Sequence, residues 1–189
     1  FTPLELRELS QEVIATHPEI AYDRTRLRKE ALWLAARRAD YVEFDVESAF
    51  AVFFVARNAV EPFADVRPTL ERLARRYTLA SLSNGNADLR LIGLHDLFTF
   101  SLNAIDVGAA KPEPLMFDLA RQRLAARPEH IVHVGDDPEH DVLGAARAGF
   151  RTVWVNRTER DWPGGSRADA EIASLIELER VLADWERER

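Results

Sequence analysis

Three short polar segments carry the residue types best suited to chemistry, and each lies between an apolar run and a helical pattern. They are Ser83 to Asn86, Gly108 to Pro114 with Lys111 in its middle, and Gly135 to Asp141. In an open parallel sheet, ligands bind beyond the carboxyl ends of the strands, so we expect these segments to lie at one edge. The sequence therefore indicates a site that combines a hydroxyl, an ammonium group and carboxylates.

The first two segments suit an anion. The hydroxyl of Ser83 and free backbone N–H groups, at the start of a helix expected over 87–94, would favour an oxyanion such as phosphate. Ser, Asn and Gly are also common in ordinary turns and caps, which is the alternative for this segment. Lys111, followed by Pro112, could present a compact charge to a phosphoryl group, or it could be a solvated lysine beside a helix.

The third segment is acidic. Asp136, Asp137 and Asp141 fall within six residues, where they would repel one another unless a cation intervened. Carboxylate oxygens are the ligands that Mg²⁺ prefers, so the segment is a candidate magnesium site. Asp137 before Pro138 is equally suited to cap a helix.

Composition excludes several other classes of protein. The 189 residues are 47% hydrophobic, enough for a real core, and the formal net charge is −7 with Lys and Arg scattered along the chain. We therefore expect no nucleic-acid partner. There is no cysteine, no apolar run of the roughly 18 residues that a membrane span needs, and no signal-peptide core. The prediction is a cytoplasmic protein without a disulfide framework or membrane partner.

The chain changes pattern near Pro62. Thr2 to about Ala59 shows helical periodicity, with breaks at His17-Pro18 and around 40–45. After Pro62, short apolar runs alternate with helical patterns, which is typical of an α/β fold with a parallel sheet. The expected strands are 78–82, 98–102, 131–134, 152–155 and 171–173, and the expected helices are 66–76, 87–94, 114–125, 139–148 and 176–186.

The hydroxyl, lysine and acidic segments, in this order, resemble the second, third and fourth signature motifs of the haloacid-dehalogenase-like hydrolases. The resemblance covers about Phe63 to Ala173 and is carried mainly by Lys111-Pro112 and by Gly135-Asp136 through Asp141. Ser83 to Ala87 is most similar to a bacterial subgroup that includes flavin mononucleotide and ribitylaminouracil-phosphate phosphatases. The resemblance implies a Rossmann-like core over residues 62–189 and a small helical cap domain over residues 1–61.

The resemblance also implies roles for individual residues of the site. Members of the family form an aspartyl-phosphate intermediate with the help of Mg²⁺. By position, Ser83 and the N–H of Asn84 would bind the phosphoryl group, and Lys111 would stabilise the nucleophile and that group. Asp136 would ligate Mg²⁺, Asp141 would reach it through water and pair with Lys111, and Asp137 is an additional candidate ligand. The implied function is a Mg²⁺-dependent phosphatase for a small phosphate monoester, such as flavin mononucleotide or a sugar or ribityl phosphate.

The first motif of the family, an apolar strand that ends in Asp-x-Asp, has no match in these residues. In the family this strand lies between those that end here at Leu82 and Val134. Adjacent strands lie about 4.8 Å apart. Without the missing strand, the two strands on either side of it would be separated by a gap of roughly twice that distance. Unpaired buried backbone is costly, so we expect upstream residues to carry this strand and the nucleophile.

Two other functions stay open. A 2-haloacid dehalogenase has the same scaffold but needs no metal, and the cluster Asp136, Asp137 and Asp141 argues against it. A catalytically inactive member of the family could serve as a binding or regulatory protein. The sequence leaves the identity of the substrate, the cap residues that touch it and the oligomeric state undetermined.

Overall fold

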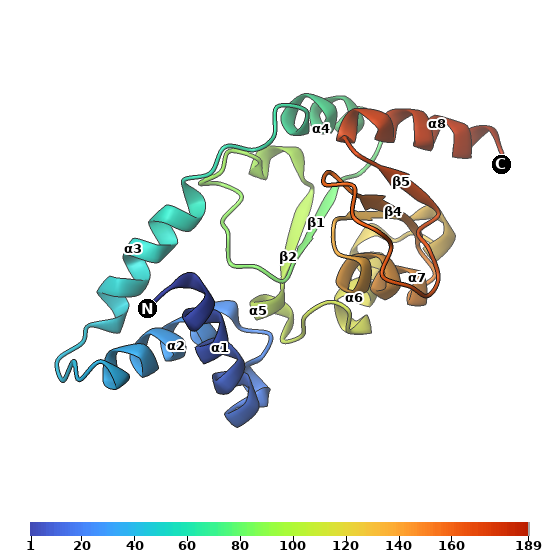
Figure 1. Ribbon diagram of the computed structural model, residues 1–189. Helices are drawn as coiled ribbons and strands as arrows, with labels where there is room; N and C mark the ends of the chain where they lie inside the picture. The colour runs from blue at the N-terminus through green and yellow to red at the C-terminus, as the bar shows by residue number, and fades with distance from the viewer. Residues whose placement is uncertain (189) are drawn as a thin grey trace. The chain divides into compact units, whose positions relative to one another are not determined.

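The computed structural model describes residues 1–188, which form two compact units (Figure 1). The first, called the helical unit, comprises Phe1–Glu61, Ser83–His95 and Asn103–Ala110. The second, called the sheet unit, comprises Pro62–Leu82, Asp96–Leu102 and the chain from Lys111 onward. Helices and strands are mixed, with a parallel sheet, so the predicted α/β class is confirmed.

The helical unit contains α1 (Pro3–Thr16), η1 (Pro18–Ile20), α2 (Arg24–Arg38), α3 (Val46–Asn58) and the short α5 (Ala104–Val107). The helix breaks at His17-Pro18 and between α2 and α3 were predicted correctly. Side chains start the helices: Thr2 forms a capping box at α1, and Asp23 and Asp45 accept backbone N–H groups at α2 and α3. Leu9, Ala31 and Ala35 form a small core where α1 packs against α2.

The strands are β1 (Ala80–Ser83), β2 (Phe100–Asn103), β3 (Val132–Gly135), β4 (Arg151–Val155) and β5 (Ala170–Ile172). Parallel pairing joins β3 to β4 and β4 to β5, whereas β1 pairs with β2 in a separate two-stranded sheet. No ladder within residues 1–188 joins β1 to β3. This is the position at which the sequence predicted a missing strand, and that strand stays a prediction.

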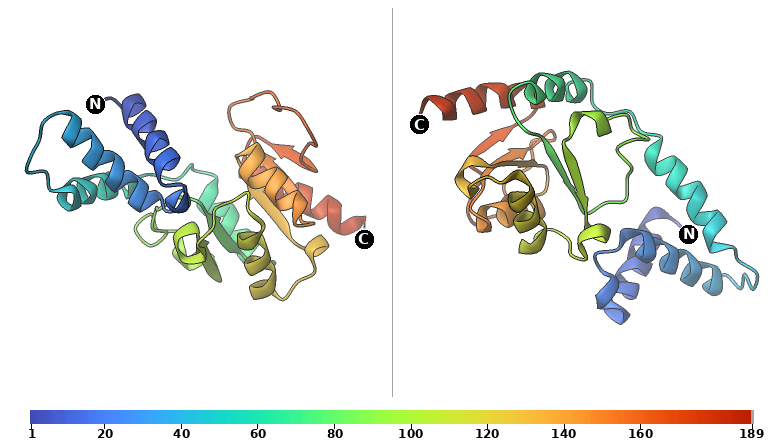
Figure 2. Two further views of the ribbon diagram at one scale, coloured as in Figure 1. Left: turned by 90° about the horizontal axis from the view of Figure 1, so that it is seen from below. Right: turned by 180° about the vertical axis from the view of Figure 1, so that it is seen from behind.

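The core of the sheet unit lies on the three-stranded sheet. Val153 and Trp154 of β4 are fully buried, and Leu73 of α4 (Val66–Ala74) and Leu178 of α8 (Leu178–Arg187) pack in the same region as Val153. Figures 1 and 2 show α4 beside α8, where Arg72 forms an ion pair with Glu179. The remaining helices are α6 (Pro114–Leu124), α7 (Gly144–Arg147), η3 (Pro128–His130) and η5 (Leu175–Glu177).

Two predicted helices differ from the structure. Residues 87–94 form turns and no helix, because the Asp88 carboxylate accepts the N–H of Arg90 and Gly93 adopts a φ of +73° that ends the turn. The 3₁₀ segment η2 (His95–Leu97) follows. The helix expected over 139–148 begins as a π-helix, η4 (Pro138–Leu143), in which the Val142 N–H reaches Asp137 O at 3.2 Å.

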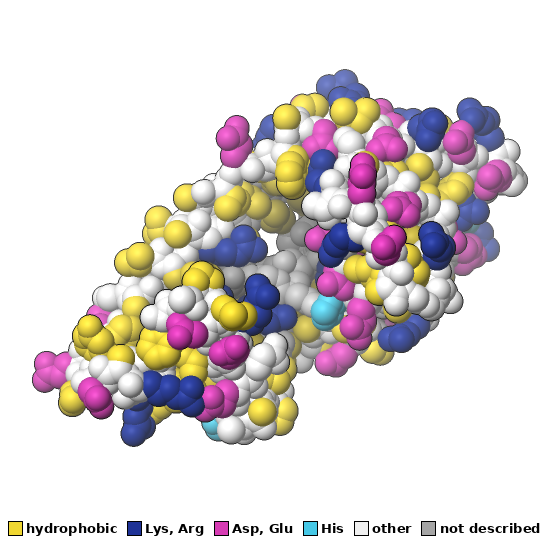
Figure 3. Space-filling view, in the orientation of Figure 1, with side chains coloured by type: hydrophobic (Ala, Val, Ile, Leu, Met, Phe, Trp, Pro, Cys, Tyr) yellow, Lys and Arg dark blue, Asp and Glu magenta, His cyan; other side chains and the backbone are white. Residues whose placement is uncertain are grey.

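Basic and acidic side chains are interspersed on the face drawn in Figure 3, in both units. None of the helices within the described residues combines the length and the apolar character needed to cross a membrane. The cellular compartment of the protein stays a prediction.

Candidate active site

In the sheet unit, Lys111 and Asp141 form a buried ion pair. Lys111 Nζ lies 2.6 Å from Asp141 Oδ1, and the two side chains are only 10% and 8% exposed. The same ammonium donates to the carbonyl oxygen of Leu82 at 2.8 Å. Lys111 thus connects the carboxyl end of β1 to the acidic segment after β3, and the structure brings together these two residues that the sequence singled out.

Further groups hold the Asp141 carboxylate. Its Oδ1 lies 3.1 Å from His133 Nε2, and its Oδ2 accepts the N–H of Asp137 at 3.1 Å. The wide π turn of η4 lets the side chain fold back over Gly135. A Cβ on Gly135 would lie 2.2 Å from Asp141 Cγ, so this position requires glycine for lack of space.

This environment keeps Asp141 ionised. Burial by itself would raise the pKa of the carboxyl group. The hydrogen bond with His133 and the charge and hydrogen bond of Lys111 outweigh burial and hold the pKa of Asp141 well below its usual range. The result is a fixed pair of opposite charges at the carboxyl ends of β1 and β3.

The other two aspartates of the segment differ from each other. Asp137 caps η4, because its Oδ1 accepts the N–H groups of Glu139 and His140 at 2.9 and 2.8 Å. Asp136 is exposed, and its carboxylate has no hydrogen-bond partner among residues 1–188. Its backbone is fixed, since the Asp136 carbonyl accepts from Trp154 Nε1 at 3.1 Å and Arg160 Nη2 at 2.9 Å.

Mg²⁺ binds through one or two carboxylates and keeps several waters. Nowhere in residues 1–188 do three or more His, Asp or Glu side chains converge as a metal cluster. Asp136 fits a direct ligand because its carboxylate is exposed and unpaired. The oxygens of Asp141 are engaged by Lys111, His133 and the N–H of Asp137, and Oδ1 of Asp137 caps η4.

The Ser83 loop, residues 83–88, belongs to the helical unit from its first residue. Ser83 Oγ accepts the N–H of Gly85 at 3.0 Å, which is the turn that the sequence left as an alternative. The hydroxyl proton is still available to a ligand oxygen. The expected contribution of a helix N-terminus was wrong because no helix begins here, so anion binding would depend on the hydroxyl and on backbone N–H groups such as that of Asn84.

Helices α2 and α3 hold this loop within the helical unit. Asn58, which is buried at the end of α3, accepts the N–H of Asp88 at 2.7 Å and donates to Phe54 O at 2.8 Å. Asn86 Nδ2 donates to Thr25 Oγ1 at 3.3 Å. The position of the Ser83 loop is therefore set by polar side chains of the helices and not only by β1.

Sequence reasoning missed two residues of these sites. His133 shares a face of β3 with Gly135, because side chains two residues apart on a strand point the same way. A histidine within an otherwise apolar strand was a usable signal. Asn58 offered none, since an asparagine near a helix end has the same spacing whether it binds a loop or solvent.

Residues 5–149 match the family model described as haloacid dehalogenase-like hydrolase. The chain belongs to this family. It is 32% identical over 190 residues to the 5-amino-6-(5-phospho-D-ribitylamino)uracil phosphatase YigB of Escherichia coli strain K12, a match that covers 96% of this chain and 80% of that protein. The predicted family resemblance is thereby confirmed.

This chain is also similar to dehalogenases. The (S)-2-haloacid dehalogenase 2 of Pseudomonas sp. strain CBS-3 is 29% identical over 178 residues, covering 81% of this chain and 77% of that protein. The crystal structure of a 2-haloacid dehalogenase from Pseudomonas syringae pv. Tomato DC3000 superimposes with a TM-score of 0.86 at 36% identity. That alignment covers 98% of this chain and 82% of the other.

Proposed function

We propose that this hydrolase is a Mg²⁺-dependent phosphatase that cleaves a small phosphate monoester through an aspartyl-phosphate. The observation that carries the proposal is the exposed, unpaired carboxylate of Asp136, in the same segment as Asp141, which forms the buried ion pair with Lys111. In a site without a metal, no ion-pair partner among residues 1–188 would neutralise the carboxylate of Asp136 in the segment that also holds Asp141.

The reaction would proceed in two steps. The first aspartate of the Asp-x-Asp motif would attack phosphorus as the P–O ester bond breaks, and the second aspartate of that motif would give its proton to the leaving alcohol. Water would then attack the phosphorus of the aspartyl-phosphate and pass a proton back to the second aspartate, which releases inorganic phosphate and restores the first carboxylate. A bound Mg²⁺ would neutralise charge on the transferring phosphoryl group.

The residues of this chain would position and stabilise these groups. Ser83 Oγ would donate its free proton to a phosphoryl oxygen, with the N–H of Asn84 as a second donor. Lys111 would lie where negative charge develops, held by Leu82 O and Asp141. Asp136 would hold Mg²⁺ directly, and Asp141 would act on it through water, with Asp137 as a further candidate.

The nucleophile is proposed to lie on a strand between β1 and β3. Among residues 1–188, those two strands have no ladder between them, and no Asp-x-Asp follows a strand there. Residues 1–61 would then be the cap domain and residues 62–189 the core. Trapping the phosphorylated protein, reducing it with borohydride and mapping the peptides by mass would locate the acceptor; an acceptor within these 189 residues would contradict the proposal.

The proposed substrate class is a flavin mononucleotide, ribityl phosphate or sugar phosphate ester. Support comes from the similarity to YigB, whose name specifies a phosphoribitylamino-uracil substrate. A phosphate ester of this kind is small enough for a single protein to bind without a macromolecular partner.

A second candidate is a 2-haloacid dehalogenase. Relatives of this chain carry that name, and two of the three aspartates, Asp137 and Asp141, have structural partners that need no metal. Of the three aspartates, only the carboxylate of Asp136 therefore favours a phosphatase over a dehalogenase.

Parallel assays separate these functions. The protein is incubated with a panel of phosphate esters that includes flavin mononucleotide, and separately with 2-chloropropionate, each with Mg²⁺ or with a chelator. We expect release of phosphate that stops when the chelator is present. Release of chloride that is unaffected by the chelator would instead establish the dehalogenase, and release of neither product would indicate a binding protein.

A further inference from the structure

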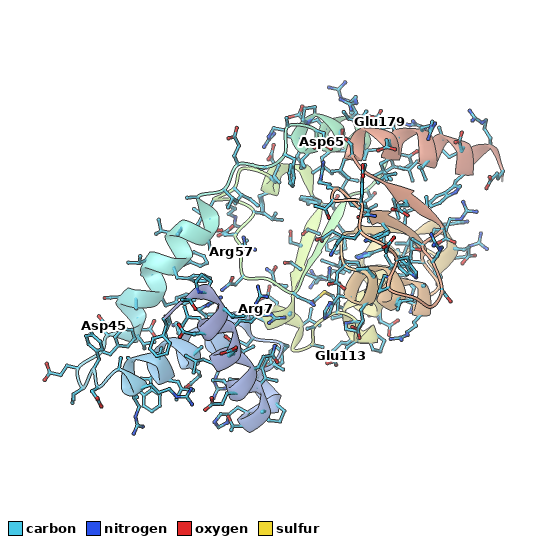
Figure 4. All side chains as sticks on the ribbon, viewed as in Figure 1. Arg7, Asp45, Arg57, Asp65, Glu113 and Glu179 are labelled. Atoms are coloured by element: carbon cyan, nitrogen blue, oxygen red, sulfur yellow. The ribbon has the colours of Figure 1, made fainter. Side chains whose placement is uncertain are left out.

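A guanidinium group from α3 lies beside the Ser83 loop, inside the helical unit. A Cβ placed on Gly85 would lie 3.4 Å from Ser83 Oγ and 3.7 Å from Arg57 Nη2. Figure 4 shows Arg57 at the end of α3 next to this loop. The missing side chain of Gly85 therefore leaves space that is bordered by a hydroxyl and by a positive charge.

The separation of these two groups lies within the span of one oxyanion. Two atoms at 3.4 and 3.7 Å from one point are no more than about 7 Å apart, and hydrogen bonds of about 2.8 Å to two oxygens of one anion can bridge such a distance. Ser83 Oγ already accepts from the N–H of Gly85, so its proton is free to be donated. Arg57 supplies only donors, so both groups that border this space can donate to a ligand oxygen.

The charge of Arg57 is not used elsewhere in the described chain. Several other arginines form ion pairs, such as Arg38 with Glu12, but among residues 1–188 Arg57 has no acidic or hydrogen-bonding partner. A basic side chain in the last turn of a helix also interacts with the helix dipole. The dipole does not account for the location of the guanidinium next to Gly85, which depends on how the loop is held.

The residue after Arg57 fixes that location. Asn58 is 6% exposed, and its side chain joins the last turn of α3 to the N–H of Asp88 in the loop. Asn86 attaches the loop to Thr25 of α2. Arg57 and Ser83 therefore belong to one locally braced arrangement.

We propose that Arg57 is a substrate-binding residue that grips an oxyanion of the substrate, together with Ser83, across the space left open by Gly85. The chemical class is a phosphate or carboxylate oxyanion. The proposal rests on the proposed function in assigning the Ser83 loop to the substrate, and it requires only that the substrate be anionic. Because Arg57 would hold the anion before and during reaction, its loss should raise KM more than it lowers kcat.

The test compares Arg57→Ala, Arg57→Lys and Gly85→Ala with wild type. A charge-assisted hydrogen bond that is lost corresponds to roughly a 10- to 100-fold weaker interaction. We expect a rise of that size in KM and in the dissociation constant of inorganic phosphate, measured by calorimetry, for Arg57→Ala. Arg57→Lys should recover part of the affinity. Gly85→Ala should weaken binding without loss of fold, because the added Cβ meets both groups only at van der Waals distance.

The matched control is Arg37→Ala. It removes the same charge from the helical unit, where Arg37 lies over the ring of Trp33 at 4.7 Å, and it should leave KM and phosphate binding within about twofold of wild type. Equal effects of Arg37→Ala and Arg57→Ala would overturn the proposal, as would an Arg57→Ala protein with unchanged affinity.

The two substrate sources are separated by the same variants. If wild type releases phosphate, the KM for the ester is decisive; if it releases only chloride, the KM for 2-chloropropionate is decisive and the phosphatase proposal alone fails. A folded wild-type protein that binds neither inorganic phosphate nor 2-chloropropionate would overturn the role of Arg57 as well.

Discussion

The Asp141 carboxylate and the Arg57 guanidinium beside the Ser83 loop differ in whether the protein supplies their partners. In the sheet unit, the Asp141 carboxylate is 8% exposed and receives Lys111, His133 and the N–H of Asp137. In the helical unit, the Ser83 proton and the Arg57 guanidinium have no partner among residues 1–188. Burial makes an unpaired charge expensive, so the Asp141 carboxylate is satisfied by protein groups, whereas the exposed Arg57 guanidinium can remain hydrated without a protein partner. Structural partners thus distinguish a charge that organises a site from one that, under our proposal, binds a ligand.

The largest effect is expected from Lys111→Ala. Removing one partner of a buried ion pair leaves the other charge uncompensated, and the cost should be about 3 kcal/mol in the free energy of unfolding. Urea denaturation followed by circular dichroism measures this value, and activity should also be lost. The double variant Lys111→Met with Asp141→Asn should recover most of the stability but none of the activity. An unchanged midpoint for Lys111→Ala would show that His133 and the N–H of Asp137 suffice to satisfy Asp141.

Alanine substitutions at Gly135 and Gly85 test whether the Asp141 site and the Ser83 loop differ in how tightly they are packed. In Gly135→Ala the new Cβ would lie 2.2 to 2.4 Å from atoms of the Asp141 side chain, so that side chain must move; we expect a loss of about 1 to 3 kcal/mol. Gly85→Ala meets nothing closer than 3.4 Å and should change the unfolding free energy by less than about 0.5 kcal/mol. Thermal and urea unfolding of both variants provide the check, and similar losses would contradict the contrast between the two regions.

Asp65 is a second carboxylate held by protein donors, and it should make the stability of the protein depend on pH. Asp65 is 11% exposed and accepts from Arg157 at 2.8 Å, Ser174 Oγ at 2.7 Å and the N–H of Leu175 at 2.8 Å. Burial raises its pKa, but these hydrogen bonds outweigh burial and lower it to about 2. Since the folded-state pKa lies below the unfolded value, the resulting stability, about 2 kcal/mol, is present above about pH 4 and is lost as the pH falls toward 2.

The variant Asp65→Asn isolates this contribution. At pH 7 it should be less stable than wild type by about that amount, and the difference should shrink as the pH approaches 2. Urea unfolding at several pH values gives both curves. Asp141 contributes equally to both proteins, so a difference that stayed constant with pH would exclude the ionised Asp65 as its source.

The smallest effect on stability is expected from Asp136→Asn. Its carboxylate is exposed and has no partner in residues 1–188, so the unfolding free energy should change by less than about 0.5 kcal/mol. Phosphate release that depends on Mg²⁺ should nevertheless fall by on the order of 100-fold, because the proposed direct ligand would be lost. Assays over a range of Mg²⁺ concentrations measure this change. Full activity in Asp136→Asn would remove the main support for the metal site.

Periodicity and punctuation predicted most of the fold. The helices before residue 59, the breaks between them and the five strands all lie where hydrophobic spacing placed them, with ends displaced by only a few residues. The helix expected over 87–94 failed because its apolar spacing competes with side-chain hydrogen bonds of Asn58 and Asp88, and Asn58 is distant in the sequence. Local propensity contains no information about such a partner.

The sequence by itself determined the chemical inventory, because residue type and spacing around strand ends suffice to propose Ser83, Lys111 and the three aspartates as a site. Only the tertiary structure divided those aspartates among a cap, a lysine partner and an unpaired carboxylate, and only it added His133 and Arg57. The reason is physical: a carboxylate's role depends on which donors reach it and on how much water remains around it, and both depend on residues far away in the chain.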